Sequence, residues 1–213
     1  MYDLLIQNGR LIDPAQSIDE RFDIAFHAGR VAAVAKSLTE ATAAETIDAG
    51  GFVVAPGMID LHVHVYAGVS HYGIPPDPTC LARGVTTAVD AGTAGASTFA
   101  GFRRYVIEAS ATRLFALLNI SRIGLVTGAE LDPPVGELED LRHLNVPAAV
   151  RCVEANRDVI LGIKLRLSAN LAANGKNELE ALKLAREAAD ATGLPVMIHT
   201  PNSSLGLPAI LAE

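Results

Sequence analysis

Hydrophobic and polar residues follow two different patterns along this chain, and the pattern changes near residue 54. Up to that point, short apolar stretches alternate with turn residues, which predicts strands at residues 3–7, 10–12, 22–26 and 30–35. The pairs Asn8-Gly9 and Ala28-Gly29 separate these stretches, and pairs of this kind favour tight turns. We therefore expect a small β region here and not a βαβ unit.

After residue 54, apolar runs rich in β-branched residues alternate with stretches of helical periodicity. This alternation is typical of parallel strands that are covered by helices. Four apolar residues recur at helical spacing between residues 178 and 192, and Gly193 follows as a C-terminal stop, so a helix is predicted there. Further helices are predicted at 98–111 and 147–156, and strands at 53–65 (interrupted by Pro56-Gly57), 86–90, 114–120, 159–167 and 195–199.

Five strands in this order predict an α/β fold of the TIM-like (β/α)8 barrel type. Such a barrel has eight strands and typically about 250 residues, whereas 159 residues follow position 54. We therefore expect about the first five βα units of a barrel at residues 55–213, after an N-terminal β domain at residues 1–54. Two explanations stay open, a fragment of a longer protein or an open sheet of different topology. The apolar, uncapped stretch at 208–213 favours an interrupted chain.

Composition and charge exclude several classes of partner. Half of the 213 residues are apolar, so the chain can bury a core, and its net charge of −7, without any basic run, disfavours nucleic acid. Cys80 and Cys152 lie far apart, so we expect small buried thiols and not disulfide or zinc-site cysteines. The start lacks a signal-peptide pattern, and no stretch approaches about 18 apolar residues. We expect a soluble cytoplasmic protein with a small-molecule substrate and no affinity for membranes.

The strongest local motif, PGMIDLHVH at residues 56–64, ends in two histidines separated by one residue. In a strand, His62 and His64 project from the same face, so both imidazoles can reach one metal ion. Asp60 shares that face and could orient a ligating imidazole or accept hydrogen bonds from nearby backbone amides. A His-x-His pair also arises by chance in strands, so the assignment depends on the rest of the chain.

A second motif, GIKLRL at residues 162–167, places Lys164 and Arg166 on one face of an otherwise apolar strand. A buried, unpaired lysine has a lowered pKa, and its neutral amine can add carbon dioxide to give an anionic carbamate. Arg166, one pleat nearer to the loop, can pair with a substrate carboxylate through two nitrogens. The alternative for both residues is a pair of salt-bridged cations at a strand end.

A third motif places His199 at the end of a predicted strand, directly before a short polar loop. Barrel enzymes carry their chemistry at the C-terminal ends of strands, where His62, His64, Lys164 and His199 all fall. Coincidence at four positions is a poor explanation. Weaker candidates, each equally suited to be a cap, a turn former or a surface group, are Asp90, Asn119, His71 and Tyr72.

Together these motifs resemble the amidohydrolase superfamily of metal-dependent hydrolases. The resemblance rests on PGMIDLHVH, on GVTTAVD at residues 84–90, on Lys164 and on His199. The segments 72–78, 90–95 and 162–166 resemble its deacetylase or dihydroorotase-like branch. In that family the N-terminal strands form part of a small composite β-sandwich, which is what the resemblance implies for residues 1–54.

The resemblance further implies a site for two divalent metal ions, of which zinc is the usual one. His62 and His64 would bind one ion, His199 the other, and Lys164, as its carbamate, would bridge them. A metal-bridged hydroxide would then attack the substrate carbonyl. The candidates for substrate contact are Arg166, Asp90, Tyr72 and Asn119, and a homo-oligomer is the family expectation.

The family also uses a histidine on the sixth barrel strand and a proton-shuttling aspartate late in the barrel. Neither occurs within these 213 residues, so no catalytic acid or base is assigned. We expect a metal-dependent amidohydrolase that acts on an amide, cyclic amide or ester. One alternative is a truncated, non-catalytic homologue that serves as a binding or structural subunit. A metal-free sugar- or nucleotide-binding protein is disfavoured, because no G-x-G-x-x-G loop opens a helix.

Overall fold

The computed structural model describes residues 1–126 and 137–213, which divide into two compact units, Met1–Gly57 and Met58–Glu213. Each unit is built on a five-stranded sheet of its own. The change of pattern near residue 54 lies close to this division. In the part of the chain that the structure describes, no helix has the length and hydrophobicity needed to cross a bilayer.

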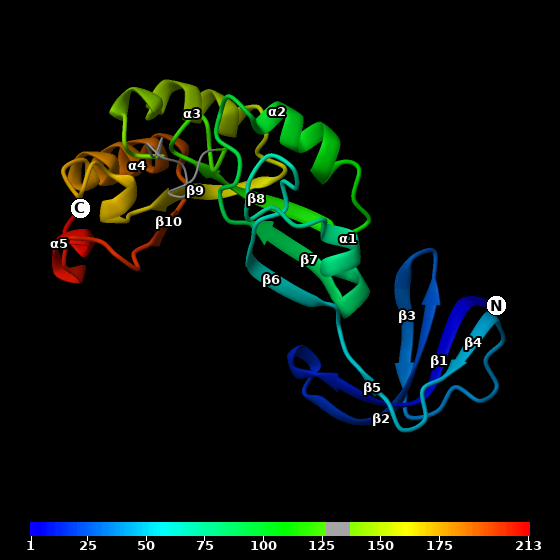
Figure 1. Ribbon diagram of the computed structural model, residues 1–213. Coiled ribbons are helices and arrows are strands. Elements are labelled where there is room, and N and C mark those ends of the chain that lie inside the picture. Colours follow the sequence, from blue (N-terminus) through cyan, green and yellow to red (C-terminus); the bar gives the residue numbers. More distant parts are fainter. Residues whose placement is uncertain (127–136) are drawn as a thin grey trace. The chain divides into compact units, whose positions relative to one another are not determined.

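The first unit is a mixed sheet in which β1 is the central partner (Figure 1). The strand order is β3-β2-β1-β4, and β5 also pairs with β1. β2 runs antiparallel to β1 and β3, whereas β4 and β5 run parallel to β1. The bounds are β1 (Tyr2–Asp13), β2 (Ile18–His27), β3 (Arg30–Ala35), β4 (Ala43–Asp48) and β5 (Val53–Val54), with a 3-10 turn, η1 (Pro14–Gln16).

One turn predicted in this unit is wrong. Asn8-Gly9 does not reverse the chain, because β1 continues through it and the pairing with β2 shifts at a bulge between Ile6 and Gly9. Asn8 takes a left-handed φ of 67°, and a Cβ on Gly9 would lie 2.5 Å from Val54 Cγ2. Glycine is therefore needed here for the close approach of β5 and not for a hairpin.

Of the other elements in this unit, one turn was predicted correctly and one strand was not predicted. The Ala28-Gly29 turn between β2 and β3 is confirmed, since His27 and Arg30 face each other across it. β4 is not predicted from the pattern, because most of its side chains are exposed and the apolar alternation is weak. Its parallel pairing with β1 comes from tertiary structure that local sequence does not encode.

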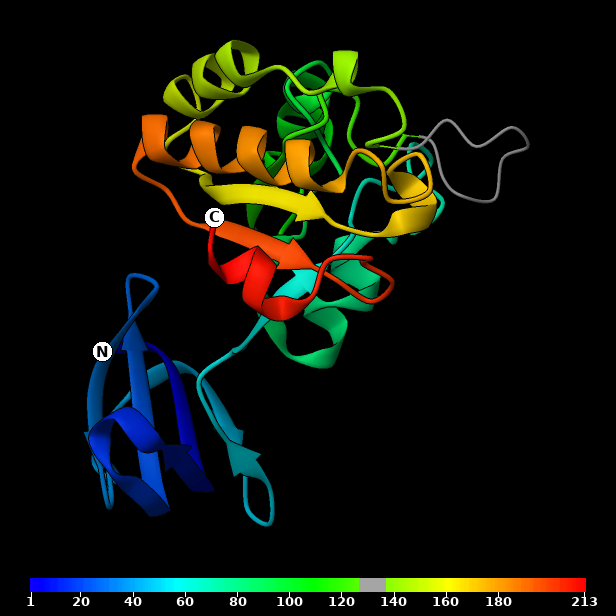
Figure 2. The same cartoon turned by 90° about the vertical axis from the view of Figure 1, so that its left-hand side faces the viewer.

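The second unit is built on a parallel sheet in the order β10-β9-β8-β7-β6 (Figure 2). Neighbours in sequence are neighbours in the sheet, and every pairing is parallel, which is the arrangement of consecutive βα units. Five parallel strands in half-barrel order are therefore confirmed, but the first is shorter than the expected 53–65, because Val53–Val54 form β5 and pair with β1 in the first unit. Their bounds are β6 (Met58–Val63), β7 (Val85–Asp90), β8 (Arg113–Asn119), β9 (Ile160–Arg166) and β10 (Val196–His199).

Helices connect these strands, and the longest, α4, packs against β9, β10 and α3 (Figure 2). The helix predicted at 178–192 has those bounds, and Gly193 ends it with φ 68°. The helices are α1 (Pro76–Thr79), α2 (Phe99–Phe102), α3 (Val146–Glu154), α4 (Glu178–Thr192) and α5 (Leu207–Leu211), and the short turns are η2 (Leu81–Arg83), η3 (Arg103–Ile107, π-helical), η4 (Leu141–His143) and η5 (Ala169–Leu171).

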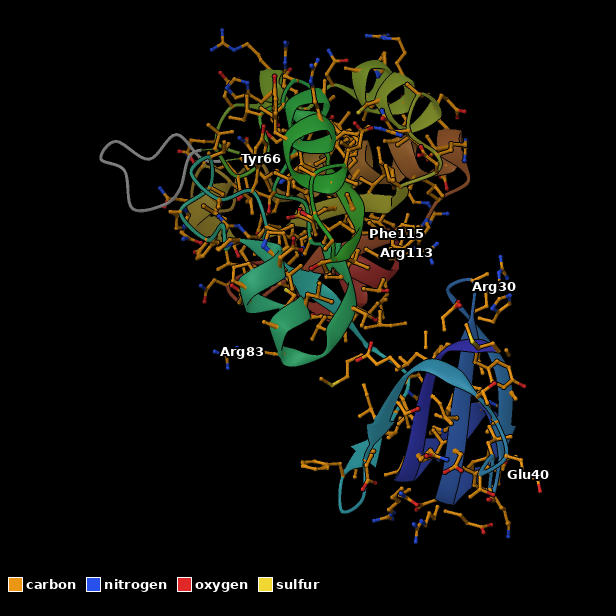
Figure 3. The ribbon with its side chains drawn as sticks, turned by 90° about the vertical axis from the view of Figure 1, so that its right-hand side faces the viewer. Arg30, Glu40, Tyr66, Arg83, Arg113 and Phe115 are labelled. Atoms are coloured by element: carbon orange, nitrogen blue, oxygen red, sulfur yellow. The ribbon has the colours of Figure 1, made fainter. Side chains whose placement is uncertain are left out.

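The register of the parallel sheet brings the carboxyl ends of its strands to one edge. Lys164 on β9 is level with Asn119 on β8 and with Met197 on β10, and Arg166 is level with His199. In Figure 3, Tyr66 in the loop after β6 lies apart from Arg113 and Phe115, which belong to the opposite, amino-terminal end of β8. The polar residues expected at strand ends therefore share one end of the sheet.

Candidate functional site

A cavity of about 240 Å³ opens at the carboxyl ends of the strands in the second unit. It contains all four residues predicted as metal ligands and two of the four predicted to contact substrate. The cavity is lined by His62, His64, Tyr72, Ala91, Leu125, Lys164, Arg166 and His199. The fold thus brings together residues that lie up to 137 positions apart in the sequence.

The three imidazoles of the cavity form a short row with His62 in the middle. Its ring centroid lies 5.5 Å from that of His64 and 5.7 Å from that of His199, and both contacts are edge-on. His62 and His64 come from the end of β6 and the residue after it, whereas His199 ends β10. Imidazoles at this spacing are close enough to serve together as ligands of one small group of ions, and they do not stack on one another.

Burial lowers the pKa values of these imidazoles and so favours their neutral form. The pKa of His64 falls to about 4, first because the ring is buried and then because its cationic form would be repelled by the cationic forms of His62, Lys164, Arg166 and His199. The pKa values of His62 and His199 are also lowered, again by burial first and by Lys164 second. A neutral imidazole has a free ring-nitrogen lone pair, which is the form that binds metal.

Lys164 is a buried amine on β9 that faces the cavity. Its exposed fraction is 2%, and burial lowers its pKa to about 8. Its Nζ donates to Met197 Sδ at 2.9 Å, and in the described part of the chain no carboxylate oxygen lies within ion-pairing distance of it. A substantial neutral fraction near pH 8 makes this amine nucleophilic.

Gly92, in the loop after β7, makes room for the stem of Lys164. A Cβ at this position would lie 2.4 Å from Lys164 Cγ, and the backbone φ of 86° is one that other residues rarely adopt. Gly92 lies in segment 90–95, whose sequence suits a turn. The contact of Gly92 with Lys164 on β9 is visible only in the folded chain.

Arg166 is held by Glu137, which the sequence pattern did not single out. Its guanidinium lies 2.6 Å from Glu137 Oε1 and over the ring of Tyr72, 5.6 Å from the centroid. The carboxylate is fully buried, and burial raises its pKa although Arg166 and Asn119 oppose that shift. Glu137 belongs to none of the motifs found in the sequence, so local sequence gives no signal for it.

Asn119 and Asp90 lie beneath the cavity and do not line it. Both polar ends of Asn119 are occupied, since its Nδ2 donates to Gly92 O and Glu137 Oε2 and its Oδ1 accepts from Ser121 N. Direct contact of either residue with substrate stays a prediction. The observed contacts support a structural task for Asn119, which is to position Glu137.

Asp90 is also committed to internal contacts. Its oxygens accept from Val65 N (2.9 Å), Thr93 N (2.6 Å) and Thr93 Oγ1 (2.7 Å), and burial raises its pKa to about 6. Thr93 Oγ1 lies 2.9 Å from Nδ1 of His64. A chain of hydrogen bonds therefore runs from Asp90 through Thr93 to an imidazole of the cavity.

Five further residues complete the comparison with the sequence predictions. Asp60 accepts a hydrogen bond from the backbone amide of His62 at 2.9 Å, so it supports that backbone. Tyr72 contacts the ring of His64 at a centroid distance of 5.7 Å, and His71 stacks on Tyr72 at 3.7 Å. Cys80 is buried and Cys152 half-buried, both as free thiols.

The donors in the cavity fit the expected kind of metal centre. Within residues 1–126 and 137–213, no three His, Cys, Asp or Glu side chains converge closely enough to hold one ion by themselves. Two ions that share a lysine carbamate do not need such convergence, because each takes one or two imidazoles. Three imidazoles with lowered pKa values, beside a buried amine that has no carboxylate partner in residues 1–126 and 137–213, are chemically suited to that arrangement.

Comparison with known proteins gives relatives but no matching family model. A deacetylase of Brucella anthropi is 38% identical over 171 residues, which cover 80% of this chain and 41% of the relative. A deacetylase of Enterococcus faecalis is 33% identical over 213 residues, which cover 99% of this chain and 53% of the relative. The chain thus spans about half the length, or less, of these relatives.

Solved structures share the fold over both units. A crystal structure of a dihydroorotase has a TM-score of 0.86 at 32% identity, covering 98% of this chain and 54% of the other. A crystal structure of an adenine deaminase has a TM-score of 0.84 at 32% identity, covering 100% of this chain and 54% of the other. Each likeness includes both sheets and about half of the similar protein.

Proposed function

This chain belongs to the amidohydrolase superfamily, and from that premise we propose that it takes part in metal-dependent hydrolysis of an amide, cyclic amide or ester bond in a small molecule. The deacetylase and dihydroorotase names of its relatives favour a carbon–nitrogen bond. The chain covers about half of those proteins, so the activity is proposed for the whole protein that contains it.

One observation carries this proposal: a buried lysine amine, with no carboxylate partner among the described residues, shares a cavity with three imidazoles whose pKa values are lowered. In an ordinary core such a lysine costs free energy with nothing to offset it. We assign two ions, of the zinc type, to this group, with His62 and His64 on one ion and His199 on the other. Lys164 would bridge them after its neutral amine adds carbon dioxide and releases a proton.

Bound metal would supply a water-derived nucleophile at neutral pH and would polarise the substrate carbonyl. The chain's own residues would bind the metal, form the wall of the cavity and contact the substrate. Burial favours the neutral form of the imidazoles, and Leu125 and Ala91 form an apolar part of the wall. Arg166, fixed by Glu137 and stacked on Tyr72, presents a guanidinium to the same cavity. We assign to Arg166 the binding of a substrate carboxylate or carbonyl oxygen.

The test uses the full-length protein, its metal content and its rate on N-acetyl amino acids, O-acetyl acids and dihydroorotate. Lys164→Ala and His62→Ala are expected to lose bound zinc and hydrolysis together. Short carboxylates such as acetate should restore part of the rate of Lys164→Ala, because they can occupy the place of the carbamate. His27→Ala is the control, since His27 is exposed in the first unit beside Asp3.

Two results would contradict the proposal. One is a Lys164→Ala protein that keeps the zinc content and rate of the wild type. The other is a wild-type protein that binds no zinc, manganese or iron and is not activated when these are added.

A further inference from the structure

We propose that Asp90 and Thr93 form a positioning pair that keeps the proton of His64 on Nδ1 and leaves Nε2 as the nitrogen that binds a ligand. The identity of that ligand as metal rests on the proposed function, but the position of the proton does not. Neither Asp90 nor Thr93 lines the cavity, so the pair acts through His64 and touches no substrate.

The first step of the argument is the carboxylate. Asp90 is fully buried, and its two oxygens accept from the backbone amides of Val65 and Thr93 and from the Thr93 hydroxyl. An ionised carboxylate can only accept hydrogen bonds. With three donors directed at it, Asp90 requires that the Thr93 hydroxyl give its proton to Oδ2, at 2.7 Å.

The second step of the argument concerns the hydroxyl group of Thr93. A threonine side chain has one proton to donate, and Thr93 has given it to Asp90. The oxygen of Thr93 therefore meets Nδ1 of His64, 2.9 Å away, with a lone pair only. A hydrogen bond at that distance requires that Nδ1 carry the proton. In a neutral imidazole the lone pair is then on Nε2.

The pair is also rigidly built. Thr93 is fully buried, and its carbonyl accepts from the backbone amide of Leu125 at 2.9 Å. A Cβ on Gly124 would lie 2.2 Å from that same carbonyl oxygen, so the backbone of the neighbouring loop approaches closely. Asp90 ties the loop after β7 to the start of the loop after β6 through Val65. His64 thus depends on contacts from two strand ends.

The other two imidazoles give an internal comparison. In the described part of the chain, no ring nitrogen of His62 or His199 has a hydrogen-bond partner, whereas His64 has Thr93. We therefore expect His64 alone of the three to be held in one tautomer before any ligand binds.

The chain also offers a matched control. Thr112 is buried to 1% exposure and donates its hydroxyl to Asp77 Oδ1 at 2.7 Å, the same pairing as in Thr93 and Asp90. It lies at the start of β8, outside the cavity. Thr112→Val thus removes the same kind of hydrogen bond without an imidazole attached to it.

The experiment compares full-length wild type, Thr93→Val, Thr93→Ser and Thr112→Val. Nitrogen NMR of ¹⁵N-histidine-labelled, metal-free protein reports the tautomer of each ring, and His64→Gln assigns the His64 signals. Zinc titration with a competing chelator gives the affinity. Thr93→Val is expected to shift His64 away from the pure Nδ1–H form and to weaken zinc binding about 10- to 100-fold. Thr93→Ser should keep both properties, and Thr112→Val should keep both while losing stability.

The proposal is overturned if His64 in Thr93→Val keeps the tautomer of the wild type, or if Thr112→Val weakens zinc binding as much as Thr93→Val. A wild type that binds no zinc would contradict the proposed function instead, because the NMR comparison in metal-free protein still decides where the proton lies.

Discussion

Both units of this chain carry exposed ion pairs, and they differ in that the second unit also holds a buried one. In the first unit the ion pairs are exposed: the side chains of Arg10 and Asp19, for example, are 60% and 55% exposed. In the second unit Arg166 and Glu137 are 14% and 0% exposed, and Lys164 is buried with no carboxylate partner among the described residues. Exposed pairs contribute little to stability, whereas buried charges cost desolvation energy. Charges retained at that cost lie at the end of the sheet to which we assign the proposed function.

The largest expected effect comes from breaking the buried pair. Glu137→Ala leaves Arg166 in its site without a counter-charge, and we expect a loss of about 3–5 kcal/mol in the free energy of unfolding. Denaturant titration measures it. Glu20→Ala is the control in the first unit, where it removes the exposed partner of Lys36 and should leave the midpoint nearly unchanged. Equal losses in both variants would remove the distinction between the units.

The next largest loss of stability is expected from adding a methyl group at Gly92. Gly92→Ala places a Cβ 2.4 Å from Lys164 Cγ and a strained φ on an alanine, so we expect a loss of about 1–3 kcal/mol and reduced zinc content. Gly29→Ala in the first unit has a similar φ, 72°, but its Cβ would meet no atom within 4 Å. It should destabilise less and leave the zinc content unchanged. A Gly92→Ala protein with full zinc content would show that Lys164 needs no such space.

The smallest effect is a pH dependence. Backbone amides of Ala111 and Thr112 hold the pKa of Asp77 below its usual value. Because the folded pKa lies below the unfolded one, the stabilisation is present above about pH 4 and is lost as pH falls through the folded pKa. The stability difference between wild type and Asp77→Asn should therefore stay constant above about pH 5 and shrink as pH falls below about 4. Thermal melts at several pH values measure it.

Asp48→Asn provides the matching variant in the first unit. The pKa of Asp48 is lowered by the Asn8 side chain and the nearby Gly50 amide, and the group is exposed. We expect a smaller pH-dependent difference than for Asp77, whose hydrogen bonds join α1 to the segment that leads into β8. The reverse order would contradict this comparison.

Much of the second unit could be predicted from sequence, because its apolar runs and helical spacing record burial directly. The bounds of α4 and the five parallel strands follow from that pattern, and strand ends in such a sheet must meet, which groups His62, Lys164 and His199. Periodicity does not predict which residues outside the helices and strands contact the site. Glu137 and Thr93 act through a few specific tertiary contacts, so neither leaves a signal in the sequence around it.

The first unit was harder to predict for a related reason. Asn8-Gly9 suits a tight turn and a bulge equally well, and only the pairing of β1 with β2 on both sides of it decides between them. The exposed strand β4 lacks the apolar alternation that marks a half-buried strand.

The most direct test of the account is anomalous diffraction at the zinc edge from crystals of the full-length protein grown with zinc and bicarbonate. We predict two anomalous peaks in the cavity, one beside His62 and His64 and the other beside His199, with added density on Nζ of Lys164 joining them. A cavity without anomalous peaks, or peaks beside an unmodified Lys164 amine, would contradict the bridging role on which the proposed function depends.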